Sequence, residues 1–465
     1  MSASTPAATY VHNHFSRFIQ ELVEYARIPS VSFPGFPPET LEASAAWTAQ
    51  KMEAAGLENV EFLTVPGAPP YVYGEWLHAP GKPTILLYAH HDVQPPGRPE
   101  KWLSPAFDPV QRGDRLFGRG TADDKAGGMM HLAALESYLK TEGKLPVNVR
   151  FFIEGEEEVG SEHLEAFLKT HEARLKSDVM ILTDTANLDV GLPSLTYRLR
   201  GLVDALVEVR TLDHPVHSGL WGGPAVDALT CLNQILSRLL TPEGKIAIPD
   251  FYEGVLEVKG IEKERLASLP FDEEKFREQL GSVGSLHLGG EKEFSVYERI
   301  WCRPSLAVLG IDAPSVEKTS NQIVEWARAK VSARIVSGMD PEKSLQRLVQ
   351  FLAKDPPCGA EVTVTAGKAG DPWLIEPVGP VYEAAARALK KGFERDAVFI
   401  GCGGSIPFVE PLTKHFGGIP ALLMGIEDPH TNAHGENESL CLSDFKKGIL
   451  SAVYLYEELG KLINW

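Results

Sequence analysis

The chain has 465 residues, 43% of them hydrophobic, so it can bury a sizeable core and is long enough for more than one domain. Its formal net charge of -18 predicts an acidic surface, which excludes nucleic acid and anionic membranes as expected partners. The sequence also lacks an apolar run long enough to span a bilayer.

The five cysteines are widely spaced and include no Cys-x-x-Cys pair. This spacing predicts reduced thiols rather than a disulfide framework or a cysteine metal site. Residues 1–10 are small and polar, without the basic and apolar regions of a secretory signal. We therefore expect a cytoplasmic protein.

The N-terminal part of the chain alternates predicted helices and strands. Apolar residues recur at helical spacing over 11–25, and a second helix over 39–55 is followed by Gly56, a typical C-cap. Apolar runs rich in strand-forming residues follow at 84–89, 147–153 and 179–183, with a helix at 127–139. This alternation predicts an α/β fold, a mainly parallel sheet with helices on both faces.

The pattern changes after Pro193. Strands that alternate apolar and polar residues are expected at 202–209, 331–336 and 361–365, with helices at 224–240 and 344–354, as in an α+β domain. The α/β pattern then resumes, with a helix at 381–391, a strand at 421–425 and a helix at 442–459. We therefore expect one domain made of 1–195 and 373–465, with a second domain, 196–372, inserted into it. Residues 250–300 support no prediction.

Histidines and acidic residues follow the predicted strands, where sites form in open α/β sheets. These residues are His90 and Asp92 after the first strand, Glu156, Glu157 and Glu158 after the second, Asp184 after the third, Asp123 in a glycine-rich loop before a helix, and His434 after the last strand. Crowded carboxylates raise one another's pKa unless a cation is present. Imidazole and carboxylate without cysteine suit zinc, manganese or cobalt, so the sequence predicts a metal site.

Five motifs in this order resemble the co-catalytic two-zinc metallopeptidases, which include carnosinases, bacterial dipeptidases, aminoacylases and succinyl-diaminopimelate desuccinylases. They are YAHHDVQP at 88–95, GRGTADDK at 118–125, EEVGSE at 157–162, Asp184 with LTYRLRG at 195–201, and AHGENE at 433–438. The resemblance covers nearly the whole chain. It implies a zinc-peptidase catalytic domain in 1–195 and 373–465, and a lid or dimerisation domain in 196–372.

The resemblance also implies the metal ligands. Asp123 would bridge two divalent ions, zinc foremost, with manganese or cobalt as alternatives. His90 and Asp184 would complete one site, and Glu158 and His434 would complete the other.

Further roles in the catalytic domain follow from the same resemblance. Asp92 would orient His90, and Glu157 would act as the general base that takes a proton from a metal-bridging water. The peptide bond between Asp123 and Asp124 is expected to be cis. The run of three glutamates departs from the family pattern, so a shifted register with a metal on Glu156 or Glu157 stays open.

In the inserted domain, the loop HPVHSG resembles a lid loop whose histidine, in dimeric family members, reaches the partner's active site and stabilises the oxyanion. His217 is the candidate, with His214 as the alternative. Arg334 matches the arginine that holds the substrate carboxylate, a task suited to its bidentate fork, unless it is simply a solvated residue. Asn321 matches a further substrate contact, and Ser405 lies in a glycine-rich loop expected to bind the same carboxylate.

Asp184 favours one branch of the family, because aspartate at this ligand position is typical of members that process dipeptides. We expect metal-dependent hydrolysis of dipeptides or short peptides with a free C-terminal carboxylate, by a homodimer formed through the inserted domain. One alternative is an N-acyl- or N-carbamoyl-amino-acid amidohydrolase of the same family. Another is a non-catalytic member that binds peptides.

Overall fold

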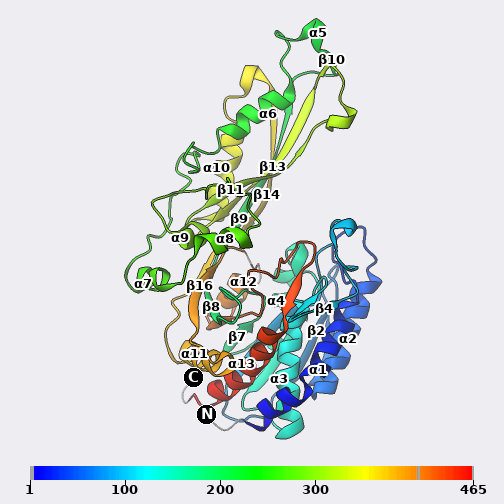
Figure 1. Cartoon of the computed structure of the whole chain (residues 1–465), viewed down its shortest axis with the longest axis vertical. Helices are drawn as coiled ribbons and strands as arrows, with labels where there is room; N and C mark the ends of the chain where they lie inside the picture. Colours follow the sequence, from blue (N-terminus) through cyan, green and yellow to red (C-terminus); the bar gives the residue numbers. More distant parts are fainter. Residues whose placement is uncertain (1–4, 405, 407–408, 463–465) are drawn as a thin grey trace. The chain divides into compact units, whose positions relative to one another are not determined.

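The computed structural model describes residues 5–404, 406 and 409–462 (Figure 1). The chain forms two compact units. Unit 1 comprises Met1–Tyr197, Glu376–Ile400 and Pro407–Trp465, and unit 2 comprises Arg198–Ile375 and Gly401–Ile406. Among the described helices, none has the length and apolar character needed to cross a membrane.

Unit 1 is built around a mixed sheet with helices packed on it (Figure 1). The helices are α1 (Pro6–Ala26), α2 (Glu39–Ala55), α3 (Lys125–Thr141), α4 (Leu164–Leu175), α11 (Pro380–Phe393), α12 (Val409–His415) and α13 (Leu442–Gly460). The strands of the sheet are β1 (Glu58–Leu63), β2 (Tyr71–Trp76), β3 (Thr84–His90), β6 (Asn148–Glu154), β7 (Val179–Leu182), β8 (Ser194–Leu199), β16 (Val398–Cys402) and β17 (Ala421–Leu423). A small second sheet contains β4 (Val110–Arg112), β5 (Arg115–Phe117) and β18 (Ser439–Cys441).

The strand order in the large sheet is β1-β2-β6-β3-β7-β17-β8-β15, where β15 is Trp373–Leu374, and β16 also pairs with β8. The central strands β6, β3, β7 and β17 are parallel, whereas β1, β2 and β8 pair antiparallel. The expected mainly parallel sheet is therefore confirmed at its centre. Because β3, β6 and β7 run the same way, their carboxyl ends meet at one edge of the sheet.

Local sequence explains the helix ends in unit 1. Thr5 caps α1 by accepting a hydrogen bond from Ala8 N, and Gly56 ends α2 with a φ of 99°, as the sequence predicted. Lys125, the first residue of α3, is fully buried, and its Nζ donates to the carbonyls of Tyr25 (3.0 Å) and Ile28 (2.7 Å). The start of α3 is thereby tied to the end of α1.

Unit 2 is an antiparallel sheet in the order β11-β13-β9-β14, with α6 and α10 packed on it. Its strands are β9 (Gly201–Arg210), β11 (Ser305–Asp312), β13 (Trp326–Ile335) and β14 (Glu361–Gly370), and the two helices are α6 (Ala228–Ser237) and α10 (Pro341–Ala353). The remaining elements are β10 (Val216–His217), α5 (Ser218–Trp221), α7 (Gly260–Ser268), α8 (Glu273–Gln279), α9 (Val296–Trp301), β12 (Gln322–Ile323) and β15 (Trp373–Leu374). Fully buried side chains such as Val203, Val207 and Leu348 form its core.

Several sequence-based boundaries in unit 2 were wrong, among them the end of β14, which runs to Gly370 and not to Thr365. The helix expected at 224–240 is shorter, because Asp227 accepts a hydrogen bond from Thr230 N and so caps a helix that starts at Ala228. The strand expected at 331–336 already begins at Trp326, where it pairs with Arg210 of β9.

Candidate active site

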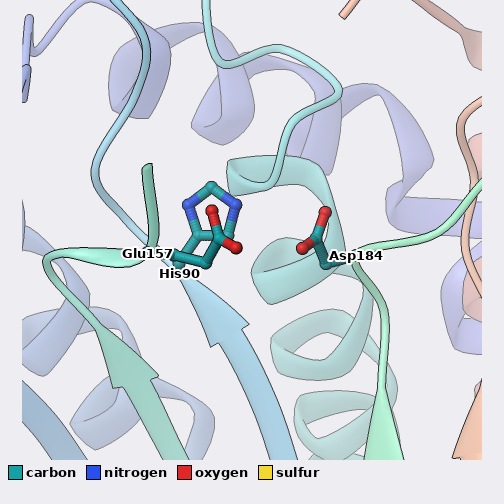
Figure 2. A group of neighbouring side chains, drawn as sticks. All are labelled: His90, Glu157 and Asp184. Atoms are coloured by element: carbon teal, nitrogen blue, oxygen red, sulfur yellow. The ribbon is translucent and has the colours of Figure 1, made fainter. Parts of the chain in front are cut away.

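The carboxyl ends of three parallel strands bring a histidine and two acids together. His90 is the last residue of β3, Glu157 follows β6 in a short 3₁₀ helix, and Asp184 lies just beyond β7. One ligand atom from each of these residues lies within 4.8 Å of the others. Figure 2 shows the Asp184 carboxylate turned toward the imidazole of His90 and the carboxylate of Glu157.

Asp123 lies between two histidines. Its Oδ1 is 3.1 Å from His90 Nε2, and its Oδ2 is 3.2 Å from His434 Nε2. The same His434 nitrogen is 3.4 Å from Glu158 Oε2. Each carboxylate oxygen of Asp123 therefore contacts a different histidine, which is the arrangement that a bridging ligand requires. The peptide bond between Asp123 and Asp124 is cis, as expected.

Asp92 is fully buried beside this group and holds several parts of it. His90 Nδ1 lies 3.0 Å from the Asp92 carbonyl and 3.4 Å from its Oδ1. The Asp92 carboxylate also accepts hydrogen bonds from the backbone N–H groups of Glu157 (3.2 Å) and Glu158 (3.0 Å), and from Ser32 Oγ (2.7 Å). One carboxylate thus orients the histidine and the turn that carries both glutamates.

The three consecutive glutamates have different surroundings. The Glu156 carboxylate accepts hydrogen bonds from the Tyr71 hydroxyl (2.5 Å) and the His163 backbone N–H (3.0 Å), and lies 2.8 Å from His163 Nδ1. Glu156 is therefore engaged outside the group of potential ligands. Glu157 and Glu158 each lie in a group with His90 that could hold a metal ion.

Burial makes the charged forms of these acids unfavourable. It raises the pKa of Glu157 to about 7, with the charges of Asp92 and Asp123 acting in the same direction. Burial likewise raises the pKa of Glu158 and of Asp184 well above the ordinary range. Hydrogen bonds from His434 and His90 overcome the effect of burial on Asp123 and hold its pKa below the usual range. Crowded buried carboxylates with nearby imidazoles fit divalent metal ions, which neutralise the charge.

Sequence reasoning missed Glu427, which follows β17. A carboxylate oxygen of Glu427 lies within 4.8 Å of ligand atoms of Asp123 and Asp184. The loops that carry Asp184 and Glu427 are joined by backbone pairing between Ala186 and Glu427. Its place after an apolar strand was a usable signal, because Glu157, Glu158 and Asp184 share it.

The other residues predicted to be in the site belong to unit 2. His217 lies in β10, and its Nδ1 accepts a hydrogen bond from Gly219 N (3.0 Å), whereas His214 is exposed beside Asp213. The Asn321 carbonyl accepts hydrogen bonds from the backbone N–H and the hydroxyl of Ser218. Arg334 lies on β13, where burial lowers its pKa. Ser405 lies outside the described residues.

Histidines and carboxylates grouped at the strand ends of an α/β unit define a candidate metal-dependent hydrolase. The model of peptidase family M20/M25/M40 matches residues 86–458. A cysteinylglycine-S-conjugate dipeptidase of Corynebacterium striatum is 31% identical to this chain, over 91% of each sequence. The Cys-Gly metallodipeptidase dug1 of Schizosaccharomyces pombe is 29% identical, over 95% of each sequence.

A solved structure agrees with these matches. The crystal structure of human carnosine dipeptidase 1 matches 98% of each chain with a TM-score of 0.86 and 26% sequence identity. The chain belongs to peptidase family M20/M25/M40 and is therefore a hydrolase of peptide bonds.

Proposed function

We propose that this protein is a two-metal dipeptidase, which hydrolyses dipeptides or short peptides that have a free C-terminal carboxylate. The observation that carries the proposal is the position of Asp123, with one carboxylate oxygen on His90 and the other on His434. The relatives support the choice of substrate, because a Cys-Gly dipeptidase and a carnosine dipeptidase match nearly the full chain.

In this proposal the five ligands divide between two ions, zinc foremost, with manganese or cobalt as alternatives. Asp123 belongs to both sites, His90 and Asp184 complete one, and Glu158 and His434 complete the other. When bound, the ions would polarise the scissile carbonyl and lower the pKa of the attacking water.

Glu157 is the general base in the proposed mechanism. Its carboxylate lies in the same group as His90 and Asp184, and its pKa of about 7 suits a group that gains and loses a proton near neutral pH. Glu157 takes a proton from the attacking water and gives it to the leaving amine. Asp92 supports this step by fixing the backbone N–H of Glu157.

Unit 2 is proposed as the lid and dimerisation domain, within the expected bounds 196–372, and the remainder as the catalytic domain. Arg334, Asn321 and Ser405 are proposed to hold the substrate, with the guanidinium of Arg334 pairing with its carboxylate. His217 is proposed to stabilise the oxyanion. We further propose a cytoplasmic location, in keeping with five cysteines that are all free thiols.

The function is tested with a panel of dipeptides, C-terminally amidated dipeptides and N-acyl- or N-carbamoyl-amino acids on protein of defined metal content. Dipeptides are expected to turn over. Amidation removes the carboxylate charge and is expected to lower kcat/KM by about 10- to 100-fold, the effect of losing a hydrogen bond to a charged group. Faster turnover of the acylated or carbamoylated amino acids would instead identify an amidohydrolase. Peptide binding without cleavage of any compound would identify a non-catalytic member.

A homodimer is supported by β11, an edge strand of the unit 2 sheet. Val308, Leu309 and Ile311 on this strand are 42%, 61% and 47% exposed. An apolar edge strand of this kind is typical of a surface that pairs with another chain. A second copy of unit 2 would cover these side chains.

If His217 acts across such a dimer, mixing two inactive variants restores activity. His217→Ala keeps an intact metal site, whereas Asp123→Ala keeps an intact lid histidine. After subunit exchange, the mixture is expected to regain roughly a quarter of the wild-type rate, because half of the dimers are mixed and each has one complete site. A mixture of Asp123→Ala and Glu157→Ala, both damaged in the same site, is the control and should stay inactive. No recovery with His217→Ala despite exchange would contradict the proposal.

A further inference from the structure

Arg119 and Glu438 form an ion pair inside unit 1 to which the proposed mechanism gives no role. Arg119 is 1% exposed and Glu438 is fully buried, and Arg119 Nη1 lies 2.7 Å from Glu438 Oε2. Two buried charges are costly unless both are paired and hydrogen-bonded. The further contacts of each partner therefore show what the pair holds in place.

The Glu438 carboxylate holds the loop that carries Asp123. Besides the bond from Arg119, its Oε2 accepts a hydrogen bond from Gly120 N (3.1 Å). Its Oε1 accepts hydrogen bonds from Ala122 N (3.0 Å) and from Asp123 N itself (3.2 Å). The backbone that leads into the proposed bridging ligand is thus fixed by one carboxylate.

The second nitrogen of Arg119 reaches the loop after β3. Arg119 Nη2 donates to the Pro95 carbonyl (3.1 Å). The preceding residue, Gln94, donates its backbone N–H (3.1 Å) and its side-chain amide (2.7 Å) to the two oxygens of Glu158. Arg119 therefore anchors the segment that orients Glu158.

The same nitrogen also reaches the loop that carries His434. Arg119 Nη2 donates to the Gly435 carbonyl (3.1 Å), next to His434, whose backbone has a φ of 63°. The His434 side chain is 60% exposed, so little packing surrounds it. The hydrogen bond at Gly435 is thus a direct restraint on the backbone of this ligand.

In the other proposed metal site, His90 and Asp184 are held in position by other contacts. His90 is the last residue of β3 and is paired in register with Glu154 of β6. Asp184 lies just beyond β7, which pairs with β3 on the opposite side. The sheet itself therefore positions these two ligands.

We infer that the Arg119–Glu438 pair is a positioning device for one metal site, the one formed by Asp123, Glu158 and His434. It holds the loops that carry Asp123 and His434 and the segment that orients Glu158, and the cation of Arg119 offsets the added carboxylate of Glu438. The site that contains His90 and Asp184 depends on it less, through Asp123 alone. This inference rests on the ligand assignment in the proposed function.

The test compares the metal affinities of wild-type protein and Arg119→Lys. Lysine keeps a positive charge beside Glu438 but has no second nitrogen for Pro95 and Gly435. Metal-loaded protein is dialysed against buffers of decreasing free Zn²⁺, and bound zinc is measured by mass spectrometry. One ion per chain should be released at free Zn²⁺ about 10- to 100-fold higher than in wild type, with the affinity for the other changed much less. Activity should return toward the wild-type kcat at saturating Zn²⁺.

A second variant and a control separate positioning from general damage. Arg119→Met combined with Glu438→Gln leaves no unpaired buried charge, and should weaken the same single site. Glu458→Gln is the control, because Glu458 pairs with Arg387 and Lys391 between α11 and α13. Equal weakening of both sites, unchanged affinities, or the same effect in Glu458→Gln would overturn the inference.

Two variants of the proposed metal ligands distinguish a wrong ligand assignment from a wrong positioning role for the Arg119–Glu438 pair. His434→Ala and Asp184→Ala should each leave one ion per chain. If both variants still hold two ions, the ligand assignment is wrong and the proposed function loses its support. If each loses one ion while Arg119→Lys keeps both affinities, only the positioning role is wrong.

Discussion

Glu157→Gln is expected to lower kcat by about 10²- to 10⁴-fold, the usual contribution of a general base. Glutamine has nearly the same shape but cannot accept the proton of the attacking water. Because Glu158 and not Glu157 is the proposed ligand, the metal content should stay at the wild-type value. Initial rates on a cleaved dipeptide, with metal analysis of the same sample, measure both quantities.

Glu156→Gln is the matched control for this experiment. Glu156 is bound by Tyr71 and His163, outside the group of potential ligands, so its loss should affect folding stability more than kcat. If Glu157→Gln instead loses a metal ion, Glu157 is a ligand and the assignment is shifted by one residue.

Removal of the metal ions is expected to abolish activity, with a loss of at least about 10³-fold, because several kcal/mol of transition-state stabilisation disappear. The buried acids cannot replace this contribution, since none of them supplies the positive charge that is needed. Dialysis against a chelator, followed by addition of Zn²⁺, Mn²⁺ or Co²⁺, measures the loss and its recovery.

The same treatment should also lower the thermal unfolding midpoint. Asp184 and Glu158 are buried acids whose charged forms are unfavourable without a cation. In addition, metal ions that bind the native state stabilise it, and this stabilisation is lost when the ions are removed. Asp123→Ala should respond little to the chelator, because the bridging ligand is already missing. Full activity in metal-free wild-type protein would contradict the two-metal mechanism.

The parts of the site that the sequence could predict are those placed by strands. His90 and Asp184 follow apolar runs, and the central parallel strands bring them to the same edge. The family resemblance assigned Asp123 and His434 to the two proposed metal sites, which no local pattern does. The structure places His434 against Asp123 even though the His434 side chain is largely exposed.

Other features depend on contacts that only the folded chain creates. Arg119 and Glu438 are separated by 319 residues in the sequence, so no spacing rule connects them. Glu156, Glu157 and Glu158 are chemically identical neighbours, and it is their contacts in the folded chain that distinguish them, such as those of Glu156 with Tyr71 and His163. The boundary of α6 depends on the cap at Asp227, which a broad helical pattern does not reveal.

The interrupted path of the chain through unit 1 has a consequence for its synthesis. Strand β17 lies between β7 and β8, although residues 200–420 come between β8 and β17 in the chain. A ribosome releases the N-terminal part first, so β7 and β8 emerge long before the strand that separates them. His434 emerges later still. The group of proposed metal ligands therefore cannot assemble until the segment that carries His434 has been synthesised and has left the ribosome.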